Sequence, residues 1–237
     1  MPNDYFKFKQ FTIQHGNCAM KVGTDGVLLG AWANVEDVNS ILDIGTGSAL
    51  IAIMLAQRSK AKITAIEIDK DAFLQAKENI QNCKWHERIK VENISMQDYV
   101  AQTINKFDLI VCNPPFFENS LLNPNEKKSL ARHSIALSFD ELIEGSLKLL
   151  NQTGSLSLII PYQEFESFSQ KVTLKGLFLN KIFKIKPNED KGIKRVICEF
   201  GRIKKPFTET LLAIEKGERH IYTNEYISLT KDFYLKF

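Results

Sequence analysis

From residue 41 onward, short apolar runs rich in β-branched residues alternate with segments of helical periodicity. This alternation constrains the fold more than any other feature, because it is typical of parallel strands whose connecting helices cover both faces of a sheet. Such strands are buried on both sides, so their apolar runs are continuous. The sequence predicts an α/β fold with seven strands, at residues 40–45, 62–69, 88–94, 107–113, 155–161, 177–186 and 194–203.

The first forty residues do not follow this alternation. Phe6 and Phe8 alternate with Lys7 and Lys9, a ribbon pattern with one apolar and one basic face. Predicted helices occupy residues 25–33, 49–57, 70–82, 139–150, 163–174 and 225–237. We therefore predict an N-terminal cap over residues 1–35 and a single folded unit, the predicted catalytic domain, over residues 36–237.

Composition and charge exclude several classes of protein. The most apolar window, residues 41–56, is interrupted by Asp43 and by the polar run Gly45 to Ser48, so the sequence predicts no membrane span. The N-terminus lacks the apolar core of a signal peptide, which favours a cytoplasmic protein. The four cysteines form no CxxC pair, and this spacing argues against both a zinc site and a disulfide framework. No metal is expected.

A glycine-containing loop, Asp43-Ile44-Gly45-Thr46-Gly47-Ser48-Ala49, leaves the first strand and opens a helix. Its glycines let the backbone approach a ligand closely and direct amide donors toward it. Glu67 ends the second strand, where a carboxylate can accept both hydroxyls of a ribose, and Asp98 follows the third strand, where it can meet an adenine amino group. An NAD-binding fingerprint would need a third glycine at position 50, which is Leu50.

The residues Asn113-Pro114-Pro115-Phe116 follow the fourth strand, at the sheet edge where ligands of open α/β sheets bind. The two prolines restrict the backbone and fix the Asn113 side chain and the Pro114 carbonyl as two acceptors. Two acceptors on the hydrogens of a planar amine favour a pyramidal nitrogen whose lone pair can attack a methyl sulfonium in line. Phe116 offers a face on which a base can stack. A plain diproline turn with a core phenylalanine is the competing interpretation.

Asp43, Gly45, Gly47, Glu67 and Asp98, in this order, resemble the binding elements of Rossmann-like S-adenosylmethionine-dependent methyltransferases. The resemblance implies S-adenosylmethionine as cofactor and a mixed, mostly parallel sheet with helices on both faces and its last strand antiparallel. The family usually has a third glycine in this loop, where this chain has Ala49. We expect tolerance of its methyl group, because the position should be helical. The tetrapeptide at Asn113 resembles the catalytic motif of enzymes that methylate planar nitrogens.

The N-terminal FKFKQFTIQH, followed by MKVGTDGVLLGAWA, resembles the tRNA1(Val) (adenine(37)-N6)-methyltransferase family, as do Arg132-His133 and the late KRVICEF. The resemblance implies that Lys21, Thr24 and Asp25 border the methionine end of the cofactor; alternatively, Thr24 or Asp25 caps a helix. It also implies transfer of a methyl group to N6 of adenine 37 in the anticodon loop of tRNA. Other hypotheses remain: methylation of guanine N2 in ribosomal RNA or of a protein glutamine N5, or a module that binds cofactor and RNA without catalysis.

Two further features bear on RNA binding and proton transfer. The segment from Lys181 to Lys205 contains nine basic and three acidic residues, and this excess of positive charge favours a surface that binds the RNA backbone over a merely solvated face. Phe6 and Phe8 are candidates for an additional RNA-facing surface, with core packing as the alternative. His133 is not expected to act as a general base, because methylation makes the nitrogen acidic enough to lose its proton without one.

Overall fold

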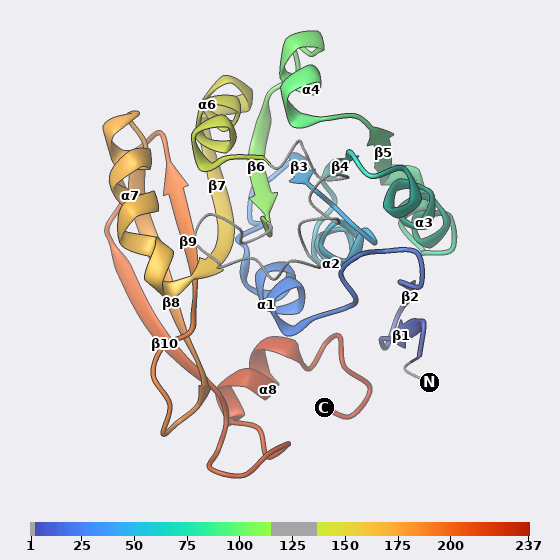
Figure 1. Cartoon of the computed structure of the whole chain (residues 1–237), viewed down its shortest axis with the longest axis vertical. Helices are drawn as coiled ribbons and strands as arrows, with labels where there is room; N and C mark the ends of the chain where they lie inside the picture. The colour runs from blue at the N-terminus through green and yellow to red at the C-terminus, as the bar shows by residue number, and fades with distance from the viewer. Residues whose placement is uncertain (1–2, 115–136) are drawn as a thin grey trace, which may run out of the picture.

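The computed structural model describes residues 3–114 and 137–237, and a twisted sheet forms their centre (Figure 1). The eight strands of this sheet follow the order β10-β8-β9-β7-β6-β3-β4-β5 among the described residues. The strands are β3 (Ser40–Ile44), β4 (Lys62–Glu67), β5 (Ile89–Asn93), β6 (Phe107–Cys112), β7 (Leu150–Pro161), β8 (Phe178–Asn188), β9 (Arg195–Gly201) and β10 (Thr208–Glu215). Only β9 is antiparallel to its neighbours, β7 and β8. The predicted mostly parallel sheet with its antiparallel seventh strand is confirmed.

The predicted number of seven strands is wrong, because β10 adds an eighth. This strand lies at the edge of the sheet and pairs in parallel with β8. Leu212 is its one buried residue, whereas the side chains from Thr208 to Leu211 are exposed. An edge strand covered on part of one face does not need the apolar run by which the other strands are predicted.

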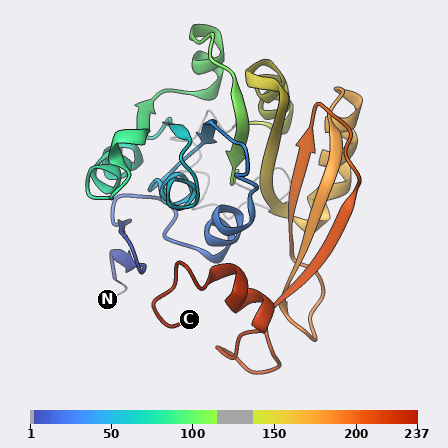
Figure 2. The same ribbon diagram turned by 180° about the vertical axis from the view of Figure 1, so that it is seen from behind.

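Helices cover both faces, as the alternation predicts (Figures 1 and 2). Side chains of α1 (Thr24–Trp32), α2 (Leu50–Arg58), α3 (Lys70–Gln81) and α8 (Asn224–Thr230) join one hydrophobic cluster. Side chains of α4 (Met96–Gln102), α6 (Phe139–Leu149) and α7 (Phe165–Leu174) join a second cluster on the opposite face. Short 3-10 turns occupy η1 (His86–Arg88) and η2 (Tyr162–Glu164). Among the described residues, no helix is long and apolar enough to span a membrane.

The helix boundaries differ from the prediction in three places. The helix α4 was not predicted; it has seven residues and begins at Met96 after a Ser95 cap. The predicted helix at residues 163–174 begins with the turn η2, and the one at residues 225–237 ends at Thr230.

The N-terminal ribbon is a hairpin of β1 (Tyr5–Lys7) and β2 (Thr12–Gln14), which lies beside α3 and the C-terminal segment (Figure 2). Phe8 is 1% exposed, and its ring lies 4.7 Å from that of Phe6 and 5.8 Å from that of Tyr234. These contacts are core packing. The hypothesis that Phe8 faces RNA is therefore wrong, because its ring is buried in the core and stabilises the attachment of the hairpin to the domain. Phe6 is only partly buried, and its contact with RNA stays a prediction.

Candidate active site

Most of the predicted site residues lie at the carboxyl ends of four parallel strands, β3, β4, β5 and β6. This end of the sheet is here called the carboxyl edge. In the register of the sheet, Ile44 of β3 lies opposite Ile66 of β4 and Cys112 of β6. Asn113 therefore follows β6 next to Gly45, the residue after β3, and Glu67 ends β4 on the other side. Residues far apart in sequence meet here because parallel strands end at the same edge.

The loop after β3 presents bare backbone at this edge. Gly45 and Gly47 have φ angles of +67° and +56°, and a Cβ atom added to either would meet nothing within 4 Å among the described residues. The Gly45 and Thr46 amides donate to the Ile66 carbonyl at 3.0 and 3.1 Å, which fixes the loop against β4. The open space in front of a rigid glycine backbone fits the predicted close approach of a cofactor.

Ala49 differs from the prediction. It was assigned to a helical position, but it is the N-cap of α2 and has a left-handed backbone with φ +64° and ψ 20°. A non-glycine residue in this region costs about 1–2 kcal/mol because its Cβ approaches its own carbonyl oxygen. The third glycine of the related loops would avoid this strain. The cost of alanine at position 49 therefore comes from its backbone conformation and not from a lack of room for its methyl group.

Asp43 is completely buried at the end of β3. Thr46 Oγ1 donates to its Oδ2 at 2.6 Å, whereas Oδ1 has no hydrogen-bond partner among the described residues. Burial raises the pKa of Asp43 to about 7, against hydrogen bonds from Thr46 and from the Ala52 amide, and the Glu67 carboxylate adds to the rise. The Ala52 amide of α2 thus faces the same carboxyl group, so Asp43 holds the glycine loop and the start of α2 together. Contact of Asp43 with a cofactor stays a prediction.

The raised pKa makes the stability of the free protein pH-dependent. The unfolded chain releases the Asp43 proton near pH 4, but the folded chain holds it until about pH 7. This group's contribution to the free energy of unfolding should therefore fall as pH rises between these values and level off above them. The fall should be on the order of a few kcal/mol, since one pKa unit corresponds to about 1.4 kcal/mol. In urea titrations, the Asp43→Asn protein should gain stability over the wild type between pH 5 and pH 8; a constant difference would contradict the assignment.

Glu67 has a structural task that the sequence did not reveal. Its side chain is 8% exposed; Oε2 accepts the Gly47 amide at 2.8 Å, and Oε1 accepts the Asp69 amide at 2.9 Å. The carboxylate thus ties the glycine loop to the end of β4. Each oxygen retains a further lone pair, so the predicted role toward two ribose hydroxyls is compatible with this anchoring.

Asp98 lies in the first turn of α4 and is exposed. Its amide donates to Ser95 Oγ at 3.0 Å, and Ser95 Oγ donates to Asp98 Oδ2 at 2.7 Å, so Asp98 takes part in the cap that Ser95 forms on α4. A hollow of about 740 Å³ opens beside it, between the ends of β4 and β5 and the helices α4 and α6. It is lined by Ile68, Asn93, Ile94, Ser95, Gln97, Asp98, Gln102 and Glu141. The predicted contact with an adenine amino group remains compatible with this position.

Sequence reasoning missed Asn93 in this hollow. Its side-chain amide donates to the Glu67 carbonyl at 2.8 Å and to the Ile68 carbonyl at 3.1 Å, and so joins the ends of β5 and β4. An asparagine at a strand end is the only signal that could have indicated this bridge.

Asn113 and Pro114 follow β6. Asn113 Oδ1 is buried and has no hydrogen-bond partner among residues 3–114 and 137–237, and Pro114 is buried. A side-chain oxygen without a partner in the described part of the chain is compatible with the predicted acceptor. Pro115 and Phe116 lie outside the described residues, as do Arg132 and His133.

The residues before and in α1 are held by ion pairs. Lys21 Nζ lies 3.5 Å from Asp4 Oδ1, and Arg195 Nε donates to Asp25 Oδ2 at 2.8 Å. The N-cap of α1 is Gly23 and receives no side-chain cap bond, so the cap interpretation of Thr24 and Asp25 is wrong. Contact of Lys21 and Thr24 with a cofactor stays a prediction.

The basic segment from residue 181 to 205 does not form one surface. Lys181 pairs with Glu199 at 3.2 Å, and Lys184 pairs with Glu209 at 2.6 Å. Because β9 runs antiparallel to β8, Lys194 lies at the carboxyl edge of the sheet, bonded through its carbonyl to the Tyr162 amide, and Lys205 lies at the opposite edge. Only part of the segment therefore lies at the end of the sheet where Asn113 follows β6.

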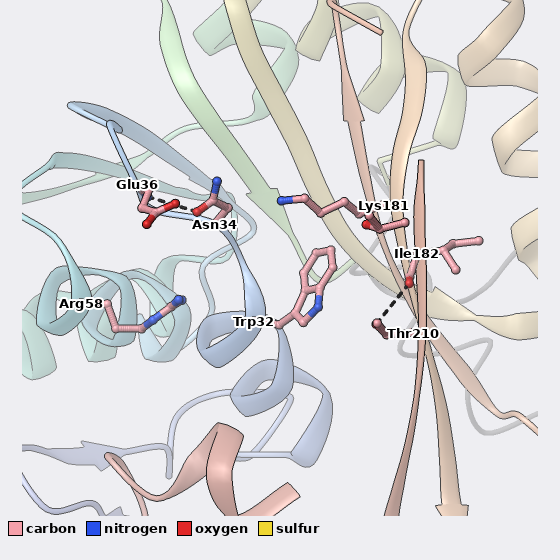
Figure 3. A pocket seen from close by; sticks show the side chains of 8 residues that line it. Trp32, Asn34, Glu36, Arg58, Lys181, Ile182 and Thr210 are labelled. Atoms are coloured by element: carbon pink, nitrogen blue, oxygen red, sulfur yellow. Dashed lines mark hydrogen bonds between the residues drawn. The ribbon is translucent and has the colours of Figure 1, made fainter. Parts of the chain in front are cut away.

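A second hollow, of about 340 Å³, lies between the end of α1 and the amino-terminal parts of β8 and β10 (Figure 3). It is lined by Trp32, Asn34, Glu36, Arg58, Lys181, Ile182, Thr208 and Thr210. Arg58 donates to the Gly30 and Ala33 carbonyls at 2.8 Å each, and Lys181 is paired with Glu199. These cations already stabilise the end of α1 and a buried carboxylate, so the hollow offers no comparable binding chemistry.

No group of three or more histidine, cysteine, aspartate or glutamate side chains in the described part of the chain could hold a metal ion. The four cysteines are free thiols. The donor set at the carboxyl edge consists of backbone amides, carboxylates and one amide oxygen, which suits a polar organic cofactor that carries hydroxyl and amino groups.

The chain is similar to several known proteins in sequence and in fold. Residues 21–184 match the methyltransferase small domain family. The chain is 45% identical to the tRNA1(Val) (adenine(37)-N6)-methyltransferase of Trichodesmium erythraeum and also 45% identical to that of Parabacteroides distasonis, in each case over 100% of both chains. Its fold is similar to that of a predicted O-methyltransferase from Agrobacterium tumefaciens, with a TM-score of 0.69, 18% identity, and coverage of 88% of this chain and 96% of the other.

Proposed function

The chain belongs to the tRNA1(Val) (adenine(37)-N6)-methyltransferase family, and on this premise we propose that it transfers a methyl group from S-adenosylmethionine to N6 of adenine 37 in the anticodon loop of tRNA1(Val). One observation carries the proposal: Asn113 follows β6 beside the glycine loop and presents a buried Oδ1 with no partner among the described residues. An acceptor at this place can hold an amine next to a cofactor bound along Gly45, Gly47 and Glu67.

The chemistry that the chain itself supplies is mainly positioning. When bound, S-adenosylmethionine provides an electrophilic methyl group on a sulfonium. Asn113 Oδ1 and the Pro114 carbonyl accept the two N6 hydrogens and direct the nitrogen lone pair. Alignment of this kind can lower a barrier by roughly 7–11 kcal/mol. After transfer, the cationic nitrogen loses a proton to solvent, so no side chain is needed as a base.

We propose that residues 1–35 act as a cap on the catalytic unit formed by residues 36–237. The hairpin is fastened to that unit by Lys9, whose Nζ donates to the Lys231 and Phe237 carbonyls at 2.6 Å each. We also place the activity in the cytoplasm, since its substrate is a tRNA and the buried cysteines are free thiols.

The lysines near the carboxyl edge should help to hold RNA phosphates. The variant Lys191→Gln/Lys194→Gln should bind tRNA with a salt dependence flattened by about 1.5 in log–log slope, because each lost phosphate contact removes about 0.7–0.9. The matched control is Lys204→Gln/Lys205→Gln, which removes the same charge from exposed lysines at the other edge. Equal slopes for the two variants in filter-binding titrations would contradict this location.

Methylation of defined RNA tests the proposed reaction. Purified protein with methyl-labelled cofactor should label tRNA1(Val) that lacks the modification, and digestion should yield N6-methyladenosine. A transcript with guanine at position 37 should remain unlabelled. Label recovered as N2-methylguanosine from ribosomal RNA, or on a protein glutamine, would overturn the substrate; binding of cofactor and tRNA without any transfer would overturn catalysis.

A further inference from the structure

A buried asparagine on α3 connects the N-terminal hairpin to the glycine loop. Asn79 is 1% exposed, and its Oδ1 accepts the Gln14 amide at 2.9 Å. Its Nδ2 donates to the Gln14 carbonyl at 2.8 Å and to the Ser48 carbonyl at 2.9 Å. One side chain thus fixes the end of β2 and the loop residue directly after Gly47.

The segment that leaves Gln14 is fixed a second time by His15. This residue is 4% exposed, and its Nδ1 accepts the Val22 amide at 3.4 Å. The contact requires the tautomer with its proton on Nε2, which faces the Asn3 carbonyl at 3.0 Å. Residues 15–23, here called the N-terminal loop, are therefore held near both ends by hydrogen bonds, at Gln14 by Asn79 and at Val22 by His15, before the chain enters α1.

The N-terminal loop lies near the acidic end of β4. Burial, with the nearby carboxylates of Glu67 and Asp69 as smaller causes, raises the pKa of the Cys18 thiol to about 11. Glu67 also receives the Gly47 amide. Asn79 therefore connects the start of the N-terminal loop to the same glycine loop that Glu67 anchors.

We propose that Asn79 is a positioning residue that couples the N-terminal loop to the glycine loop and thereby sets the affinity for the cofactor. The inference rests on the proposed function only in naming S-adenosylmethionine as the bound molecule. The geometry favours this role over simple core packing because Asn79 holds two separate segments that border the site, through all three of its hydrogen bonds.

A second buried asparagine provides a matched control at the opposite edge of the sheet. Asn180 is also 1% exposed; it donates to the Ile203 carbonyl at 3.0 Å and accepts the Lys205 amide at 2.9 Å. Asn79→Ala and Asn180→Ala should lower the melting temperature by similar amounts. Calorimetry should show S-adenosylmethionine bound about 10–30-fold more weakly by Asn79→Ala and within about twofold of wild type by Asn180→Ala. If Asn79→Ala does not fold, Asn79→Asp takes its place. Aspartate keeps the oxygen that accepts the Gln14 amide, but its second oxygen would face the Gln14 and Ser48 carbonyls in place of a donor, so the connection between the two segments is lost.

A measurement without cofactor separates the coupling from the proposed function. Cys18 is partly exposed, whereas Cys83, Cys112 and Cys198 are buried, so a maleimide reports on the N-terminal loop. Asn79→Ala should increase the alkylation rate of Cys18 at least about fivefold, and Asn180→Ala should leave it unchanged. Native rates and native affinity in Asn79→Ala would overturn the coupling. Absence of cofactor binding by the wild type would overturn the proposed function, while faster alkylation in Asn79→Ala would still support the connection between the two loops.

Discussion

Replacement of Asn113 by alanine is expected to lower kcat about 100- to 1,000-fold, as the removal of one well-placed hydrogen-bonding group does in other active sites. Its Oδ1 is buried at the end of β6 without a partner among the described residues, so its deletion removes no structural hydrogen bond from this part of the chain. The melting temperature and the affinity for cofactor should therefore change little. Single-turnover measurements with saturating tRNA and cofactor would isolate the loss to the chemical step.

The variant Asn113→Asp provides the conservative comparison. It keeps acceptor oxygens at the same place, so its turnover should lie between that of the wild type and that of Asn113→Ala. Near-native turnover of Asn113→Ala would show that the Asn113 side chain does not position the amine. A loss confined to cofactor affinity would move the residue's role to the cofactor.

The central sheet could be predicted because its strands are buried on both faces. Largely apolar runs mark β3, β4 and β6, and the connecting helix α3 has the expected helical periodicity. The helix α2 is buried from Leu50 to Ala56 and is predicted by its place between two strands. The edge strand β10 escaped prediction because its exposed half carries Thr208, Glu209 and Thr210. Burial, and not intrinsic strand preference, supplied the readable signal.

The candidate site was predictable where residues follow strands, since parallel strands bring their ends to one edge. Asp43, Glu67 and Asn113 met there as expected. The tertiary bonds that shape the site had no comparable signal: Asn79 and His15 act through backbone groups of distant segments, and the left-handed Ala49 occupies a place where the sequence shows no glycine. The split of the basic segment likewise depends on strand direction, which charge patterning does not report.

Replacement of Glu67 by glutamine is expected to weaken S-adenosylmethionine binding about 100-fold or more. Both carboxylate oxygens already accept amides, from Gly47 at 2.8 Å and from Asp69 at 2.9 Å. Glutamine has only one acceptor oxygen, so its NH₂ group would face one of these donors and displace the loop. Charge-assisted hydrogen bonds to the ribose hydroxyls, worth about 1.5–3 kcal/mol each, would be lost or weakened at the same time.

The control for this effect is Asp69→Asn, which removes the same charge two residues away. Asp69 caps α3 by accepting the Ala72 amide at 2.8 Å, and an asparagine oxygen can accept the same bond. Calorimetry should therefore find near-native cofactor affinity in Asp69→Asn and a large loss in Glu67→Gln, and the melting temperature should fall more in Glu67→Gln because only this variant loses a hydrogen bond to a backbone amide. Equal losses of affinity in the two variants would assign the effect to the local negative charge. Unchanged affinity in Glu67→Gln would mean that another residue holds the ribose hydroxyls, because loss of the Glu67 carboxylate must weaken cofactor binding if that carboxylate contacts them.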